Sequence, residues 1–152
     1  MLTQCLSEPF ISMQALDFSW VSDRLLMRSL TMAPSRPSLM VMCDRIEPES
    51  AIASLMKWCE QPFHICSLPG PLELPAVKKG TLFLKDVSHL TLAQQIALND
   101  WIDSGRGDLQ IVSATDTRLW PLVEAGDFLE CLFYRLNLIT LEAKAPRKIA
   151  IA

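Results

Sequence analysis

Ionisable and hydroxyl side chains follow three short apolar runs of this 152-residue chain. They are Glu49 and Ser50 after residues 38–43, Lys85 and Asp86 after residues 81–84, and Asp116 after residues 109–113. Asp86 and Asp116 together offer hard oxygen donors of the kind that divalent cations prefer. Because Lys85 is adjacent to Asp86, an ordinary local salt bridge is the simpler interpretation.

The pattern around these side chains predicts strands that alternate with helices. Five apolar runs are too short for helices and are typical of buried strands: residues 38–43, 63–66, 81–84, 109–113 and 138–141. Helical spacing predicts helices at about residues 21–32, 51–59, 91–105, 117–126 and 128–135. This order predicts an α/β three-layer sandwich with a mostly parallel five-stranded sheet. Ligands of such folds bind at the carboxyl ends of the strands, where the charged residues lie.

Several helix ends have recognisable signals. Ser50 is a candidate N-cap for the helix over residues 51–59. Thr91 followed by Gln94 forms a capping-box pattern, and Gly105 supplies a left-handed stop for the helix that they begin. Proline and glycine between residues 68 and 79 predict a loop that connects two strands.

Composition limits the class of protein. The length and a hydrophobic fraction of 50% predict a single domain over residues 1–152, with residues 1–20 as an N-terminal extension. A net charge of -3 and a pI near 5.3 provide no basic surface for direct DNA binding. We expect no signal peptide, no membrane span and a cytoplasmic location. The five cysteines, which include no CxxC pair, are predicted to be buried thiols rather than disulfides or metal ligands.

Three segments resemble one protein family. Gly80–Val87, which reads GTLFLKDV, resembles the Walker B segment GGTLFLDEI of the sigma-54 activators, the AAA+ bacterial enhancer-binding proteins. Leu109–Leu119 resembles the sensor strand RIIAATNRDL that follows it in the family. Phe128–Asn137 resembles FREDLYYRLN, which contains arginines that face the ATP of a neighbouring subunit. The resemblance implies a P-loop NTPase core of the AAA+ type, degenerate, truncated and without the helical lid.

The family's ATP-binding residues are replaced at the matching positions. In the Walker A register GxxxxGK[ST], the glycine positions hold Cys43 and Pro48, Glu49 replaces the lysine, and only the hydroxyl of Ser50 is kept. Two unit charges about 4 Å apart interact by about 4 kcal/mol, so replacing the attraction by repulsion costs about 8 kcal/mol, or about five decades of affinity or more. The resemblance therefore implies no nucleotide or metal cofactor.

The hydrolytic positions are changed as well. Lys85 replaces the Asp that coordinates Mg²⁺, Asp86 replaces the Glu that polarises water, and Asp116 replaces the sensor Asn. Of the two family arginines, the first position is Leu129 and only Arg135 remains. Arg135 either serves a neighbour's ATP as a trans arginine or is an ordinary helix-end arginine, which is the simpler interpretation. We therefore expect no catalytic residues and no ATPase activity: the resemblance implies a pseudo-ATPase.

The sequence thus favours a non-catalytic interaction domain. We expect it to contact a protein partner, either an intact AAA+ transcription activator or another copy of itself, and to modulate that partner or its assembly. The alternative is a weak nucleotide-binding protein or ATPase with an altered pocket that includes Ser50, Asp86 and Asp116. A receiver-like phosphoacceptor module is disfavoured because no paired acidic residues follow the first predicted strand.

Overall fold

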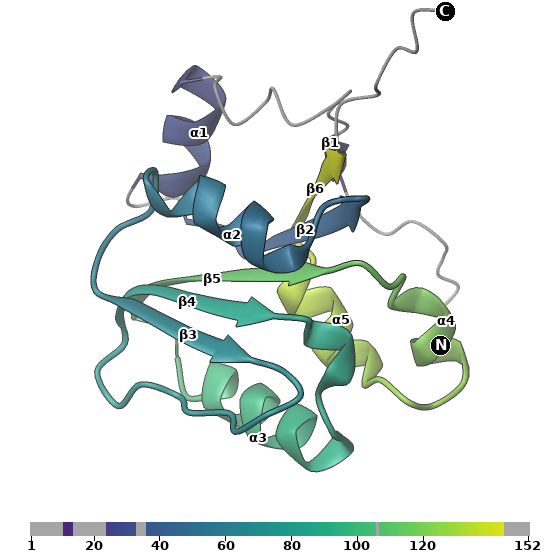
Figure 1. Ribbon diagram of the computed structural model, residues 1–152. Helices are drawn as coiled ribbons and strands as arrows, with labels where there is room; N and C mark the ends of the chain where they lie inside the picture. The colour runs from purple at the N-terminus through teal and green to yellow at the C-terminus, as the bar shows by residue number, and fades with distance from the viewer. Residues whose placement is uncertain (1–10, 14–23, 33–35, 106, 145–152) are drawn as a thin grey trace, which may run out of the picture.

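The computed structural model describes residues 11–13, 24–32, 36–105 and 107–144 (Figure 1). The remaining residues of the expected N-terminal extension, including Cys5 and Trp20, lie outside the described part. The strands are β1 (Ile11–Met13), β2 (Leu39–Asp44), β3 (Phe63–Ser67), β4 (Lys79–Lys85), β5 (Asp108–Thr115) and β6 (Ile139–Lys144). They form one six-stranded sheet in the order β1-β6-β2-β5-β4-β3. All of the pairings are parallel.

The sheet confirms the five expected strands, which are β2 to β6, and adds β1. β1 pairs with β6, with Ile11 opposite Ile139. A run of three residues is too short to show the alternation that indicates a strand. The prediction of a five-stranded sheet was therefore one strand short.

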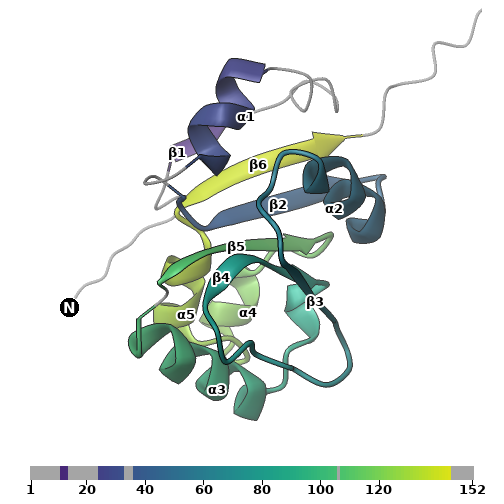
Figure 2. The ribbon, with the colours of Figure 1, turned by 90° about the vertical axis from the view of Figure 1, so that its left-hand side faces the viewer.

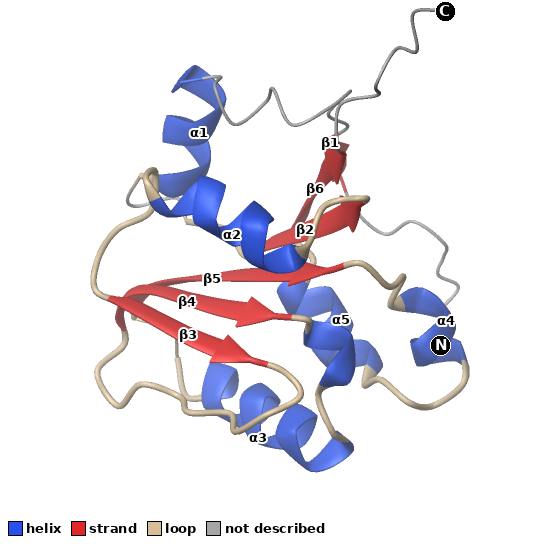
Figure 3. Cartoon of the chain, in the orientation of Figure 1, coloured by secondary structure: helices blue, strands red, loops and turns tan. Residues whose placement is uncertain are grey.

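The helices are α1 (Arg24–Thr31), α2 (Pro48–Met56), α3 (Leu92–Asp103), α4 (Trp120–Glu124) and α5 (Glu130–Leu136), with a short 3-10 helix η2 (Val87–His89). α1 and α2 lie on one face of the sheet, and α3, α4 and α5 lie on the other (Figures 1 and 2). Figure 3 shows the resulting three layers, with the strands between the helices. This arrangement confirms the predicted α/β sandwich. None of the described helices has the length and apolar character needed to cross a bilayer.

The two faces of the sheet pack into separate cores because successive side chains of a strand point to opposite faces. Under α1 and α2, the core includes Val41, Phe83 and Val112. Under α3, α4 and α5, it includes Leu82 and Ile111 from the same strands. Burial on both faces explains why these strands are nearly continuous apolar runs in the sequence.

The ends of α2 and α3 test the capping predictions. α2 begins at Pro48, with Glu47 at the N-cap and no side-chain cap, so the prediction of Ser50 as the N-cap was wrong. Proline suits the first turn of a helix because its fixed φ is already helical and its missing N–H has no partner there anyway. At α3, Thr91 and Gln94 form the predicted capping box. Gly105 has a φ of +95°, as the predicted left-handed stop requires.

The loop between β3 and β4 anchors the end of α3. Lys78 donates hydrogen bonds from its Nζ to the carbonyl oxygens of Trp101, at 2.8 Å, and of Gly105. The same ammonium lies 4.6 Å from the centre of the Trp101 ring. A cation at this place satisfies terminal carbonyls and stabilises the negative end of the helix dipole.

The prediction that the cysteines are buried holds for part of the set. Cys43 and Cys66 are buried and Cys59 is half-buried, but Cys131 is exposed on α5. The prediction for Cys131 was therefore wrong. Cys131 precedes the buried Leu132 and Phe133 in the sequence. Successive residues of a helix point in different directions, so a residue next to buried ones can itself face solvent.

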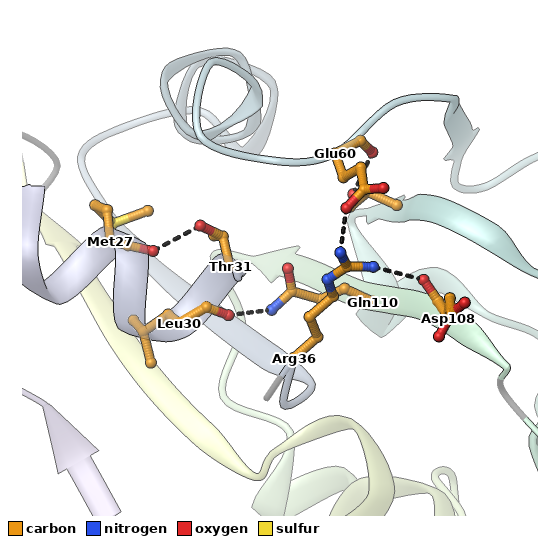
Figure 4. A network of polar contacts seen from close by, with 8 residues as sticks. Met27, Leu30, Thr31, Arg36, Glu60, Asp108 and Gln110 are labelled. Carbon is orange, nitrogen blue, oxygen red and sulfur yellow. Dashed lines mark hydrogen bonds and ion pairs between the residues drawn. The ribbon is translucent and has the colours of Figure 1, made fainter. Parts of the chain in front are cut away.

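A polar network holds α1 on the sheet (Figure 4). Gln110, which is 1% exposed in β5, donates from its Nε2 to the carbonyl oxygens of Leu30 at 2.7 Å and Pro37 at 2.9 Å. Arg36 pairs with Glu60 and donates to the carbonyl oxygen of Asp108 at 2.9 Å. The buried amide of Gln110 thus provides hydrogen-bond donors both to a carbonyl oxygen at the end of α1 and to one in the segment that precedes β2.

We expect Gln110→Leu, which keeps a side chain of similar size, to lower the free energy of unfolding by about 1–3 kcal/mol. It removes the donor from the buried carbonyl oxygen of Leu30 and from the part-buried one of Pro37. Urea denaturation followed by circular dichroism measures this change. The exposed Gln61→Leu should change the free energy by less than about 0.5 kcal/mol. Equal midpoints for the parent and Gln110→Leu would contradict the role of this amide.

Candidate functional site

The carboxyl ends of three adjacent strands lie beside the first turn of α2, and we call this edge of the sheet the crevice. Because β5 lies between β2 and β4 in a parallel sheet, the residues that end these strands meet at the same edge. This edge brings together most of the residues that the sequence predicted for the site: Cys43, Pro48, Glu49, Ser50, Lys85, Asp86 and Asp116. Arg135 is the predicted residue that does not join them.

The first turn of α2 presents acids to the crevice. Glu47 is the N-cap residue and Glu49 lies in the first turn, where the positive end of the helix dipole favours a carboxylate. Pro48 between them is buried and has no backbone N–H. Ser50 is exposed, and its backbone N–H bonds to the carbonyl oxygen of Glu47 at 2.9 Å.

Lys85 forms an ion pair with Glu49, and not with its neighbour Asp86 as the sequence predicted. The Nζ of Lys85 lies 3.5 Å from Oε1 of Glu49. The Lys85 side chain is 19% exposed and that of Glu49 is 73% exposed, so solvent screens the pair from one side. The sequence contained a signal for this pairing. Glu49 is at the position of the family's lysine and Lys85 is at the position of the family's aspartate, so the two charges are exchanged.

Asp86 and Asp116 lie close enough to repel each other. Burial raises the pKa of Asp86 above its ordinary value, and the charge of Asp116 raises it further, against the opposing effects of His89 and Lys85. Asp86 has a left-handed backbone, with a φ of 60°, directly after β4. Asp116 is exposed and accepts a hydrogen bond from Oγ1 of Thr117 at 3.1 Å.

Two observations bear on the metal interpretation of Asp86 and Asp116 and on the thiol of Cys43 beside them. The part of the chain that the structure describes contains no group of three or more His, Cys, Asp or Glu residues placed to hold a metal ion. Burial, followed by the charges of Asp116 and Asp86, raises the pKa of Cys43 to about 12. The thiol is therefore protonated at neutral pH and is a poor nucleophile or metal ligand.

Arg135 lies away from the crevice, on the helices below the sheet. Its Nη2 is 2.5 Å from Oδ1 of Asp103, and its Nη1 donates to the carbonyl oxygen of Asn99 at 3.2 Å. Both partners belong to the last turns of α3, which begins near the carboxyl end of β4 and runs back toward the start of β5. The contacts match the simpler interpretation, an arginine that binds a helix end.

Gln95 is a second connection between α3 and α5 that the sequence did not reveal. This buried amide donates from Nε2 to the carbonyl oxygens of Leu90 at 3.1 Å and Asp127 at 3.0 Å. Its Oε1 accepts from the backbone N–H of Leu129 at 2.8 Å. Leu129, at the matching position of the first family arginine, is the N-cap residue of α5.

We expect Asp86→Asn to stabilise the fold at pH 7 by less than about 1 kcal/mol. The pKa of Asp86 is higher in the folded state than in the unfolded state. Its contribution to the free energy of unfolding is therefore fully present at pH values below its unfolded pKa, and it is lost as the pH rises through its folded pKa. Asparagine removes that loss and tolerates the left-handed backbone. Urea denaturation between about pH 4 and pH 8 should show the gain shrinking toward low pH.

The matched control is Asp100→Asn on the exposed face of α3, which should change stability by less than about 0.5 kcal/mol. A gain for Asp86→Asn that stays constant down to pH 4, or a loss at pH 7, would show that the repulsion between Asp86 and Asp116 is not what limits stability here.

Known proteins share this sequence and fold. The model of the Sigma-54 interaction domain family matches residues 41–144, more than half of the chain. The putative uric acid sigma-54-dependent transcriptional regulator UacR of Escherichia coli (strain K12) is 29% identical over 119 residues, which are 70% of this chain and 20% of UacR. The alginate biosynthesis transcriptional regulatory protein AlgB of Pseudomonas syringae pv. tomato is 36% identical over 80 residues, 45% of this chain and 18% of AlgB.

The fold has solved counterparts. NtrX from Brucella abortus, in a crystal structure in complex with ATP, superposes with a TM-score of 0.60 at 17% identity, covering 88% of this chain and 37% of that chain. At this identity the likeness concerns the fold alone, and it confirms the expected AAA+-like α/β core. This chain spans about a fifth of the length of the curated relatives that it matches. The match over residues 41–144 shows that the chain belongs to the Sigma-54 interaction domain family.

Proposed function

We propose that this chain is a regulatory domain that acts by protein contact and does not bind or hydrolyse ATP. The observation that supports this most is the ion pair between Glu49 and Lys85. In the family motif, the position of Glu49 holds the lysine that neutralises phosphate, and the position of Lys85 holds the acid that binds Mg²⁺. Both charges are reversed here, and the reversed charges neutralise each other.

A triphosphate in this crevice would meet mostly negative charge. Glu47 and Glu49 flank the start of α2, the place where helix N–H groups otherwise attract phosphate. Pro48 removes one of those N–H groups. Asp86 and Asp116 lie at the ends of the neighbouring strands. Each unit charge about 4 Å from a phosphate oxygen costs about 4 kcal/mol at an effective dielectric constant of 20.

The partner that we propose is a sigma-54-dependent activator of the same family. UacR is named as such a regulator, and the present chain has the same core over residues 41–144. A domain with this core and an internally neutralised crevice would alter the activity of an intact activator through its surface. Such a role requires neither a nucleotide nor a metal in this chain.

Isothermal titration calorimetry with Mg-ATP tests the absence of nucleotide binding. We expect no saturable binding with a dissociation constant below about 100 µM, because of the repulsion described above. An intact activator ATPase serves as the positive control. Binding tighter than about 100 µM that Ser50→Ala weakens would contradict the proposal and support the altered nucleotide pocket instead.

A second measurement tests the contact. The purified chain, added in excess to an intact sigma-54 activator, should change the ATPase rate of that activator by at least about twofold if the proposed partner is correct. The same addition should leave an unrelated AAA+ ATPase unchanged. An unchanged rate together with no complex in sedimentation velocity would rule out this class of partner.

A further inference from the structure

The free edge of β3 presents an unpaired row of backbone groups. β3 pairs with β4 alone and ends the sheet (Figure 1). The N–H of Thr81 bonds to the carbonyl oxygen of Pro62, and the N–H of Leu68 bonds to that of Lys85. Since the direction of backbone groups alternates along a strand, the N–H and C=O groups of Phe63, Ile65 and Ser67 point away from β4.

This edge lacks the usual protection. Natural edge strands are commonly interrupted by charges, prolines or bulges, because bare edges pair with other chains. β3 reads Phe-His-Ile-Cys-Ser over residues 63–67 and has no Lys, Arg, Asp, Glu or Pro. Ile65 at its centre is 51% exposed. Within the described residues, no hydrogen bond reaches the outward backbone groups of Ile65.

We propose that β3 pairs antiparallel with β3 of a second copy of this chain, with the two-fold axis at Ile65. Ile65 then faces Ile65 of the partner, and Phe63 faces Ser67. The outward groups of these residues form about six hydrogen bonds in this register, since each such pair exchanges two. The result is one continuous sheet across both copies.

The strand's composition favours a second copy over an unrelated peptide. Reversal of the strand about Ile65 places no like charges opposite each other, because the strand has no Asp, Glu, Lys or Arg, and its histidine, His64, would face Cys66 of the second copy. Phe63 and Ile65 share the face of the sheet that α2 covers only in part, and Phe63 packs against Phe83 with ring centres 5.6 Å apart. The two exposed isoleucines would cover each other there.

Prolines limit the paired segment to about five residues. Pro62 precedes β3 and Pro69 follows it closely, and neither has an N–H to donate to a neighbouring strand. The interface is therefore small, and small interfaces give weak association. This pairing uses a different edge from the crevice at the ends of β2, β4 and β5, so it holds whether or not the crevice binds a nucleotide.

Sedimentation equilibrium of the full chain tests the pairing. We expect a monomer–dimer equilibrium with a dissociation constant between about 1 and 500 µM. Ile65→Lys should weaken dimerisation at least about tenfold, because it places two cations opposite each other at the axis. Ile96→Lys is the matched control: Ile96 is 48% exposed on α3, and its change should leave the dissociation constant within about twofold.

Cysteine cross-linking tests the register in a background with Cys5→Ser and Cys131→Ser. Ile65→Cys should form a disulfide-linked dimer on mild oxidation, because directly paired residues have Cα atoms about 5.5 Å apart. Ser67→Cys, at a position that is also exposed, should not form one, because it faces Phe63 of the partner. Three results would each overturn the proposal. They are a chain that stays monomeric at about 500 µM, a dimer that Ile65→Lys does not weaken, and equal cross-linking of the two cysteine variants.

Discussion

Pairing of β5 on both sides is the constraint on which the rest of the structure depends. β5 bonds to β2 along one edge and to β4 along the other. Every residue of β5 except Asp108 is buried, so a shift of one residue would move apolar side chains out of both cores. This fixed register sets the positions of Lys85 and Asp116 relative to the start of α2, and it also places Gln110 where it can hold the end of α1.

The electrostatics of the crevice follow from that placement. Lys85 meets Glu49 because the end of β4 lies under the first turn of α2. Asp86 and Asp116 end neighbouring strands and have no described cation as an ion-pair partner. Burial raises the pKa values of Asp86 and Cys43, and the charge of Asp116 raises both further, as that of Asp86 does for Cys43. The crevice therefore contains one internally neutralised pair and one pair of acids that repel each other. Neither arrangement attracts an anion, which is the physical basis for the proposed function.

The face below the sheet shows a different use of polar residues. Lys78, Gln95 and Arg135 each bind carbonyl oxygens at or near the ends of α3. These contacts join the β3–β4 loop, α3 and α5 into one layer. Arg135 is thus bound within its own chain, at the opposite end of the strands from the crevice. The open edge of β3 is the contrasting case, because its outward backbone groups have no such partners among the described residues.

The sequence by itself determined the strands β2 to β6, their order with the helices and the ends of α3, because apolar runs, capping residues and glycine act over a few neighbouring residues. It also placed Cys43, Pro48, Glu49, Lys85, Asp86 and Asp116 at strand and helix ends, which is enough to predict one crevice. Only the tertiary structure decided that Lys85 pairs with Glu49, that β1 joins β6, that Cys131 is exposed and that Arg135 binds α3. These outcomes depend on distances between residues far apart in the chain, and local patterns contain no information about such distances.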